Sequence, residues 1–346
     1  MEQRAEGLCF LRHALCARHF AASHPMKLSA MRPIALVLSR ELVITTLLLT
    51  GVSFVVFVIL YFSPGDPFSV LLEGQMPTEE ARAGVREAMG ATKAWYVQYL
   101  SWLVNMLQGN FGTSVRTGLP VAGELIRTGL STLLLTIGSM LVTLMLAVPI
   151  ALYSAVRGTN RVSWTLTMFA YVVSALPVFW LGYIVIYFFT HKLGLFPMAF
   201  GFSGAARGFS WLYFLLPVFV LGVGNGTISE VIRFLREEMS RVMAEDYIRT
   251  ARAKGASVWK HSFKEGLLIP VTEIIASKIP FILGGAVIVE EVFSWPGMGR
   301  MALQAAKDRD FPVIMGIAIL AAVFVRMGSL FQSVVYVMVN PRASKE

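Results

Sequence analysis

Charge and cysteine are both scarce in this chain. Only 15% of its 346 residues are charged, whereas soluble domains carry roughly 25%. The two cysteines, Cys9 and Cys16, lie close together near the start, where they make neither a disulfide framework nor a metal site. The remainder is 56% hydrophobic, more than a soluble core of this length needs. A protein embedded in lipid is therefore expected.

Motifs for several kinds of chemistry are also missing. The sequence has no Gly-x4-Gly-Lys-Ser/Thr phosphate loop, no His-Glu-x-x-His and no Cys-x-x-Cys. The pair Gly297 and Gly299 follows an apolar run rather than a strand, so it is not a dinucleotide motif. We expect no catalytic residue, no metal and no cofactor on this chain. The net charge of +9 is divided among loops between apolar runs, which argues against nucleic acid as a partner.

Six apolar runs predict six transmembrane helices, and the expected fold class is therefore an all-α membrane protein. A bilayer core about 30 Å thick needs about 20 apolar residues in a helix. The fifth run, 271–293, contains Glu273 and Lys278, and the sixth, 311–341, has Arg326 at its midpoint. Their apolar residues outweigh the cost of these charges. The four runs without charge are 42–65, 128–156, 162–191 and 208–229.

The distribution of basic residues predicts the orientation. With the N-terminus in the cytoplasm, the inner side receives 18 Lys and Arg residues and the outer side receives 10. The loop 233–270 contributes most of this excess. Because basic residues are enriched on the cytoplasmic side, we expect both termini to be cytoplasmic.

The chain divides into four parts on this basis. Residues 1–30 form a poorly structured basic leader, and residues 31–130 hold the first transmembrane helix and a long loop. Residues 131–341 form the transmembrane core, and residues 342–346 form a tail. We expect translation to begin at Met31, just before the first span, which N-terminal sequencing of the native protein would test.

The loop after the first span is long enough to contain helices of its own. The residues from Pro77 to Glu80 are typical of a helix start, and Gly90 ends that helix. A second helix is predicted from Trp95 to Leu107, because its aromatic residues recur at helical spacing. Two interpretations are open: a cap that packs on the bundle, or a contact with a delivered substrate or a binding protein.

The loop 233–270 predicts a helix-turn-helix elbow in the cytosol. Apolar residues recur at steps of three and four, so one helix is expected from the membrane to about Lys254. Gly255 suits the left-handed position that ends a helix. A second short helix from Ser257 returns the chain to the membrane at Pro270. Such an elbow is either a knob that fits a groove on another protein or a solvated loop beside lipid head groups.

The elbow segment 244–255 closely resembles the cytoplasmic coupling loop of binding-protein-dependent ABC permeases of the dipeptide, oligopeptide and nickel subgroup. Arg249, Thr250, Ala251 and Gly255 occupy the places of the Glu-Ala-Ala-x-x-x-Gly motif of those permeases. The long first loop is typical of the B-type subunit. Five further segments resemble the subgroup in the same order along the chain: 64–67, 96–99, 109–114, 290–299 and 309–312.

This resemblance implies a type I ABC importer permease fold in the prokaryotic plasma (inner) membrane. The fold would have six transmembrane helices, a long extracytoplasmic loop after helix 1 and a coupling elbow between helices 4 and 5. The implied partners are a second, homologous permease in a heterodimer, two ABC ATPases that bind ATP and Mg, an extracytoplasmic substrate-binding protein and membrane lipid. The implied substrates are dipeptides or oligopeptides, with nickel chelates, glutathione and cell-wall peptides as alternatives.

The resemblance also implies which residues couple transport to the ATPases, through the elbow at 244–266. Small residues would allow the elbow to approach the ATPase closely, and the basic residues would make salt-sensitive contacts with the ATPase. The implied coupling residues are Glu245, Asp246, Tyr247, Arg249, Thr250, Ala251, Arg252, Ala253, Lys254, Gly255 and Ala256.

The chain departs from this subgroup at a few positions. Asn110 and Asn340 stand where the subgroup usually has Asp, Arg326 replaces an aliphatic residue, and the stretch between Gly255 and Pro270 is shorter. These departures leave the substrate and the individual coupling contacts open.

Charges and prolines inside the spans have more than one interpretation. We expect Lys278 and Arg326 to pair with Glu230, Glu273 or a partner subunit, and binding of a peptide carboxylate is the functional alternative. Bends are expected at four prolines in the spans: Pro149, Pro177, Pro217 and Pro280.

Two other functional classes fit less well. Residues 201–204 match the Gly-x-Ser-Gly of rhomboid proteases, but Ser203 would need a His base on a later span. The only later histidine, His261, lies in the elbow. A channel or secondary transporter would need charges organised in its spans and has no use for a small-residue elbow. Co-purification with an ATPase separates this class from an ABC permease.

Overall fold

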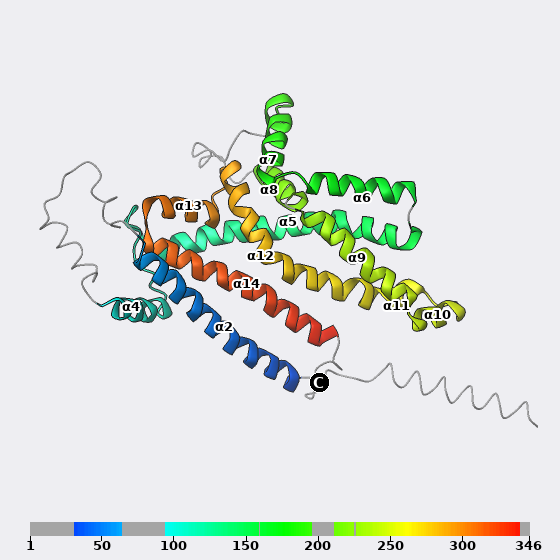
Figure 1. Cartoon of the computed structure of the whole chain (residues 1–346), viewed down its shortest axis with the longest axis horizontal. Coiled ribbons are helices and arrows are strands. Elements are labelled where there is room, and N and C mark those ends of the chain that lie inside the picture. The colour runs from blue at the N-terminus through cyan, green and yellow to red at the C-terminus, as the bar shows by residue number, and fades with distance from the viewer. Residues whose placement is uncertain (1–30, 64–93, 159, 196–210, 225, 340–346) are drawn as a thin grey trace, which may run out of the picture.

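A computed structural model of the chain describes residues 31–63, 94–158, 160–195, 211–224 and 226–339, and these ranges are mostly helical (Figure 1). The segments 64–67 and 77–90, together with Ser203 and Asn340, lie outside the described residues. Among the described residues the β-type pairing is one isolated bridge, between Thr113 and Pro120. The elements are α2 (Met31–Tyr61), α4 (Trp95–Leu107), α5 (Val121–Arg157), α6 (Arg161–Ser174), α7 (Val178–Ile186), the π-helical η2 (Tyr187–Lys192), α8 (Trp211–Val223), α9 (Thr227–Ala244), α10 (Asp246–Ala253), α11 (Val258–Phe263), the π-helical η4 (Lys264–Leu268), α12 (Ile269–Val292), α13 (Met298–Asp308) and α14 (Phe311–Val339).

The described helices include three that are long and apolar enough to cross a membrane. These are Ser39–Tyr61 of α2, the whole of α5 and Phe311–Val335 of α14. Two bent pairs, α6 with α7–η2 and α8 with α9, raise the number to as many as five. The helix α12 is 24 residues long but is not among them. An all-helical membrane fold is confirmed, while six spans stay a prediction.

The third predicted span is not a single straight helix. The α6 and α7–η2 segments meet at 99°, next to Pro177, which caps α7 with an extended ψ of 134°. Proline lacks the N–H that a continuing helix needs and disfavours the helical conformation of the preceding residue. As a result α7 projects from the side of the bundle (Figure 1). The helices continue, in contrast, through Pro149, Pro217 and Pro280.

The long helix α5 lies at the centre of the bundle and packs closely on α8. Thr136, Ser139 and Thr143 satisfy their buried hydroxyl groups by donating to the carbonyl four residues earlier, at 2.7–3.0 Å. Thr143 also lies 2.5 Å from the carbonyl oxygen of Gly222 on α8. A Cβ at Gly222 would lie 2.6 Å from the Ser139 carbonyl oxygen. Small residues therefore let the two backbones approach, as is common between helices in membranes.

The helix α9 is attached to the core by its apolar face and carries the chain away from the bundle. Ile232, Leu235 and Met239 are fully buried. The first two pack in one apolar cluster with Ala147 and Ala151 of α5. Burial of apolar surface stabilises a fold by about 25 cal/mol per Å². The buried side chains of this face therefore hold α9 in its direction against the core. The segment that follows α9 therefore extends from a firmly packed helix.

The aromatic spacing after the first loop predicts α4 at the residues where the structure has it, Trp95–Leu107. Its buried Tyr99 places its hydroxyl 2.9 Å from the Ser53 hydroxyl of α2 and 3.3 Å from the Thr50 carbonyl oxygen. The Tyr99 ring meets Phe54 edge-on, with ring centroids 5.4 Å apart. The helix α4 thus packs against α2.

Two basic residues inside predicted spans form ion pairs within the chain. Lys278 on α12 pairs with Glu230 on α9, one of the partners expected from the sequence. Arg326 on α14 pairs with Glu41 on α2, so the expected partners were wrong for this residue. The reason is the packing of α2 against α14, which joins segments almost 300 positions apart in the sequence.

Candidate functional site

The elbow that the sequence singles out is built from two helices rather than one continuous helix. α9 ends at Ala244, Glu245 adopts an extended conformation with φ −66° and ψ 148°, and α10 begins at Asp246. The predicted single helix to about Lys254 is therefore wrong. Apolar spacing of three and four residues is preserved across Glu245, so periodicity alone gives no sign of the break.

The end of α10 forms a complete Schellman motif. Gly255 has a φ of +66°, the left-handed conformation that the sequence predicts at this position. The Ala256 N–H donates to the Ala251 carbonyl at 2.9 Å, and the Gly255 N–H donates to the Arg252 carbonyl at 3.1 Å. These two bonds satisfy carbonyl groups that a helix end otherwise leaves without partners. The turn is therefore fixed by its own backbone.

Most of the predicted coupling residues are exposed, but not all of them. Ile248 and Ala251 are buried, at 0% and 5% exposure, and they seat α10 on the elbow. Ala251 therefore supports the surface of the elbow and does not form part of it. The coupling residues that are exposed are Glu245, Asp246, Tyr247, Arg249, Thr250, Arg252, Ala253, Lys254, Gly255 and Ala256.

One side-chain contact ties α10 to the returning chain. The Tyr247 hydroxyl donates to the Glu265 carboxylate of η4 at 2.9 Å. Partial burial and this carboxylate together raise the pKa of Tyr247 to about 12, so the phenol is neutral at physiological pH. The returning η4 is itself held on α9, because a Cβ at Gly266 would lie only 3.0 Å from the Met239 side chain.

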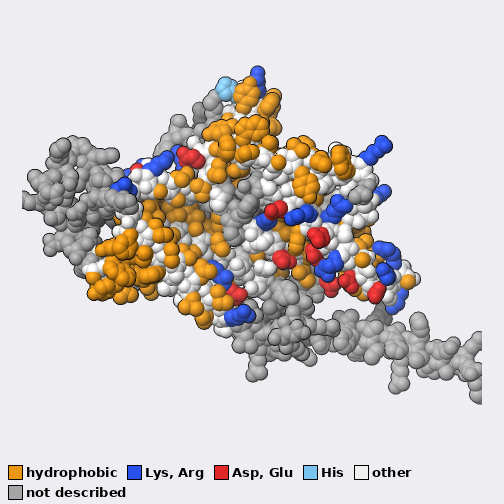
Figure 2. Space-filling model, in the orientation of Figure 1, with side chains coloured by type: hydrophobic (Ala, Val, Ile, Leu, Met, Phe, Trp, Pro, Cys, Tyr) orange, Lys and Arg blue, Asp and Glu red, His pale blue; other side chains and the backbone are white. Residues whose placement is uncertain are grey.

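The charges on the elbow have few partners within the described residues. Arg249 pairs with Asp246 at 3.3 Å, but both side chains are mostly exposed, and such a pair contributes less than about 1 kcal/mol. Figure 2 shows basic and acidic side chains together at the α10–α11 end of the molecule. This end therefore presents a charged surface that the described part of the chain does not cover.

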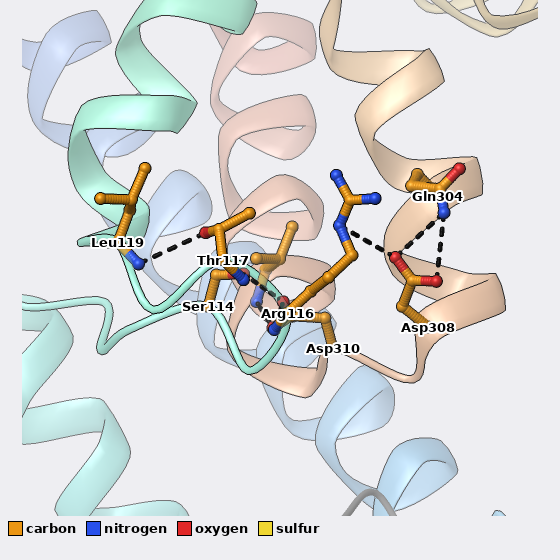
Figure 3. Close-up of polar contacts among 8 residues, drawn as sticks. Ser114, Arg116, Thr117, Leu119, Gln304, Asp308 and Asp310 are labelled. Atoms are coloured by element: carbon orange, nitrogen blue, oxygen red, sulfur yellow. Dashed lines mark hydrogen bonds and ion pairs between the residues drawn. The ribbon is translucent and has the colours of Figure 1, made fainter. Parts of the chain in front are cut away.

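The opposite end of the bundle contains two carboxylates that the sequence alone did not identify. Asp310, 2% exposed, accepts a hydrogen bond of 2.5 Å from Ser114, and the Arg116 N–H lies 3.3 Å from the same oxygen. The Arg116 side chain pairs with Asp308 at 3.2 Å, and Gln304 donates to Asp308 (Figure 3). Two of the resembling segments, 109–114 and 309–312, thus bind one another.

Glu290 is the second of these carboxylates and is fully buried. Thr132 of α5 donates to it at 2.6 Å and the Arg300 N–H donates at 2.9 Å. A Cβ at Gly297 would overlap the Glu290 carboxylate, and one at Gly299 would lie 2.9 Å from it. The two glycines are therefore needed for the chain to fold over Glu290. The sequence signals were the resemblance of the segment 290–299 to the permease subgroup and the Gly-x-Gly that follows this carboxylate.

Comparisons with known proteins agree with the resemblance. The model of the family described as "Binding-protein-dependent transport system inner membrane component" matches residues 147–345, and the N-terminal model of the same system matches residues 34–147.

Similar curated proteins each align with 88% of this chain and 97% of their own length. They include the oligopeptide transport system permease protein AppB of Bacillus subtilis, 38% identical, and a probable peptide ABC transporter permease protein of Sinorhizobium fredii, 33% identical. The glutathione transport system permease protein GsiC of Salmonella choleraesuis is 36% identical.

Proposed function

This chain belongs to the family of binding-protein-dependent transport system inner membrane components, and from that premise we propose that it imports peptides as one permease half of an ATP-driven transporter. The proposed substrates are dipeptides or oligopeptides. They are supported by relatives named for oligopeptide and peptide transport, which align with nearly their whole length.

Glutathione is the second candidate substrate. A relative named for glutathione transport is 36% identical to this chain, close to the identity of the oligopeptide relative. Glutathione is itself a small peptide with free carboxylates, so one pathway chemistry serves both substrates. Nickel chelates and cell-wall peptides are less well supported.

The proposed assembly contains a second, homologous permease, two ATPases, an extracytoplasmic binding protein and surrounding lipid. The sequence has no phosphate-binding loop, so ATP and Mg belong to the ATPases. We place the chain in the prokaryotic inner membrane with six spans and both termini in the cytoplasm. The excess of basic residues in the loop 233–270 supports this orientation.

The observation that carries the proposed mechanism is the exposed, self-terminated helix α10. Its turn is fixed by the Schellman motif at Gly255, and its base is seated by Ile248 and Ala251. A short rigid helix of this kind fits a groove on an ATPase, and movement of the ATPases would be passed to α9 and, through η4, to α12. ATP-driven closure then turns the pathway outward and hydrolysis resets it.

The proposed coupling is tested by placing a carboxylate at the tip of the elbow. We expect Gly255→Asp to abolish substrate-stimulated ATP hydrolysis in the reconstituted complex, while the permease still inserts in the membrane. The matched control is Gly158→Asp, because Gly158 ends α5 with the same φ of +66° and open space around it. Normal stimulation in the Gly255 variant, or equal loss in both, contradicts the assignment.

A further inference from the structure

The helices α9 and α12 carry charged side chains on their exposed faces. On α9 the exposed residues follow one helical stripe that includes Glu230, Arg233 and Glu237. On α12 an exposed stripe includes Glu273 and Ser277, and Gly284 is exposed further along the helix. Figure 2 shows acidic and basic side chains alternating over this region.

The exposed face of the neighbouring helix α5 is different. It consists of large apolar side chains that are 50–75% exposed, as expected of a surface in contact with lipid. They are Ile126, Leu130, Leu134, Ile137, Leu141 and Met145. Ionisable side chains inside membranes almost always face a bundle interior or a water-filled cavity. Glu273 and Lys278 lie within the predicted span 271–293 and are therefore expected to face away from lipid, whereas Arg233 and Glu237 belong to the cytoplasmic loop 233–270.

The ion pair between Lys278 and Glu230 connects these two stripes. Lys278 lies nine residues beyond the start of α12, or about 14 Å along the helix at 1.5 Å per residue. Its side chain is 20% exposed, whereas that of Glu230 is 48% exposed. The lysine is thus held at the face by a partner that water can reach.

The second intramembrane pair has a different environment. Arg326 and Glu41 have side chains only 13% and 19% exposed, and Thr45 and Ser333 add hydrogen bonds to them. That pair joins α2 to α14, and the surrounding side chains shield it from the surface. The Lys278 pair, in contrast, lies open on the charged face.

We propose that Lys278 is a binding site for carboxylates on the transport pathway. Glu230 is its counter-ion when no peptide is bound, and the terminal carboxylate of a transported peptide replaces Glu230. The proposal rests on peptide import as the function. A lysine ammonium is a compact point charge on a flexible stem, so it can follow the peptide. Glu230 balances the charge of the partly buried Lys278 when the pathway is empty.

Exchange of one carboxylate for another keeps the number of ion pairs constant. Binding is then weak enough for release, which conduction along a pathway requires. A purely structural pair predicts something different: both single substitutions would impair transport in the same direction, for every peptide.

The test is ATP-driven uptake by the complete reconstituted transporter, measured with trialanine and with trialanine amide at saturating binding protein. In Lys278→Met we expect kcat/KM to fall about tenfold for trialanine, the loss of roughly one charge-assisted hydrogen bond. For the amide, which has no carboxylate, we expect a change within about twofold. Lys278→Arg should restore most of the trialanine rate.

The opposite sign is expected for Glu230→Gln. With the competing Glu230 carboxylate removed, kcat/KM for trialanine is retained or rises, while kcat falls because the peptide carboxylate is released more slowly. Lys192→Met, at an exposed lysine of η2, is the matched control and should leave both peptides unchanged. Equal losses for the two peptides in Lys278→Met overturn the proposal and leave peptide import intact.

A second measurement does not depend on the amide. A tripeptide with a photoreactive C-terminal residue should label α9 or α12 in the wild-type complex, and less so in Lys278→Met. Labelling confined to other helices overturns the proposal. If the wild-type complex transports no peptide at all while ATP hydrolysis is intact, the proposed substrate fails and this inference fails with it.

Discussion

The two ends of the helix bundle use their charges in opposite ways. At the end that contains Asp310 and Glu290, both carboxylates are buried and accept hydrogen bonds from the same chain. At the elbow, Asp246 and Arg249 are mostly exposed. A buried carboxylate must find its partners within the fold, because leaving it unpaired costs several kcal/mol. The two carboxylates at the first end therefore find their partners within this chain, and the elbow presents its charges outward.

The largest expected effect comes from disturbing the covered end. We expect Gly297→Ala to lower the free energy of unfolding by about 3 kcal/mol or more, because the added Cβ overlaps the buried Glu290 carboxylate. Thermal unfolding of the detergent-solubilised protein measures the loss. Gly123→Ala in α5, where the new methyl group meets nothing within 4 Å, is the control. Similar stability of the two variants would mean that Glu290 is not enclosed by this turn.

A somewhat smaller effect is expected where the two resembling segments meet. Ser114→Ala removes the 2.5 Å hydrogen bond to Asp310 and leaves the buried carboxylate short of a donor. A loss of about 1–3 kcal/mol in unfolding free energy is expected. The double variant Ser114→Ala with Asp310→Asn should recover part of this loss, since the charge is gone. Purely additive losses would contradict a direct contact.

At the elbow we expect function to respond while stability does not. Arg249→Ala breaks only an exposed pair with Asp246, so the unfolding free energy should change by less than about 0.5 kcal/mol. Substrate-stimulated ATP hydrolysis by the complex should fall and should become less sensitive to salt. If Arg249→Ala lowers the free energy of unfolding as much as Ser114→Ala does, the two ends do not differ in how their charges contribute to stability.

The smallest effect is a titration within the elbow. Burial and the Glu265 carboxylate raise the pKa of Tyr247 to about 12, so its neutral form stabilises the fold below about pH 10. That contribution is lost as the pH rises through about 12. Ultraviolet difference titration of wild type against Tyr247→Phe isolates this group. In Glu265→Gln the pKa of Tyr247 should move towards 10. An unchanged pKa would mean that Tyr247 does not contact Glu265.

The sequence predicted the elements that depend on neighbours along the chain. The aromatic spacing from Trp95 to Leu107 predicts α4 at its observed bounds, and Gly255 predicts the left-handed residue that ends α10. Both features follow from local backbone preference. The break at Glu245 was missed because the helical spacing of apolar residues continues across it. For the 99° bend after α6, the sequence predicted a bend at Pro177 but not the size of its angle.

By itself, the amino-acid sequence determined that the chain is a helical membrane protein, which family it resembles and where the elbow lies. Hydrophobic length, turn residues and motif order are all properties of short stretches. Only the tertiary structure decided that Glu290 is covered by its own Gly-x-Gly turn, that Ser114 binds Asp310 and that Arg326 pairs with Glu41. The Ser114–Asp310 and Arg326–Glu41 contacts join segments far apart in the sequence, whose neighbourhood is set by packing. A carboxylate in the sequence does not reveal which donor the fold will place beside it.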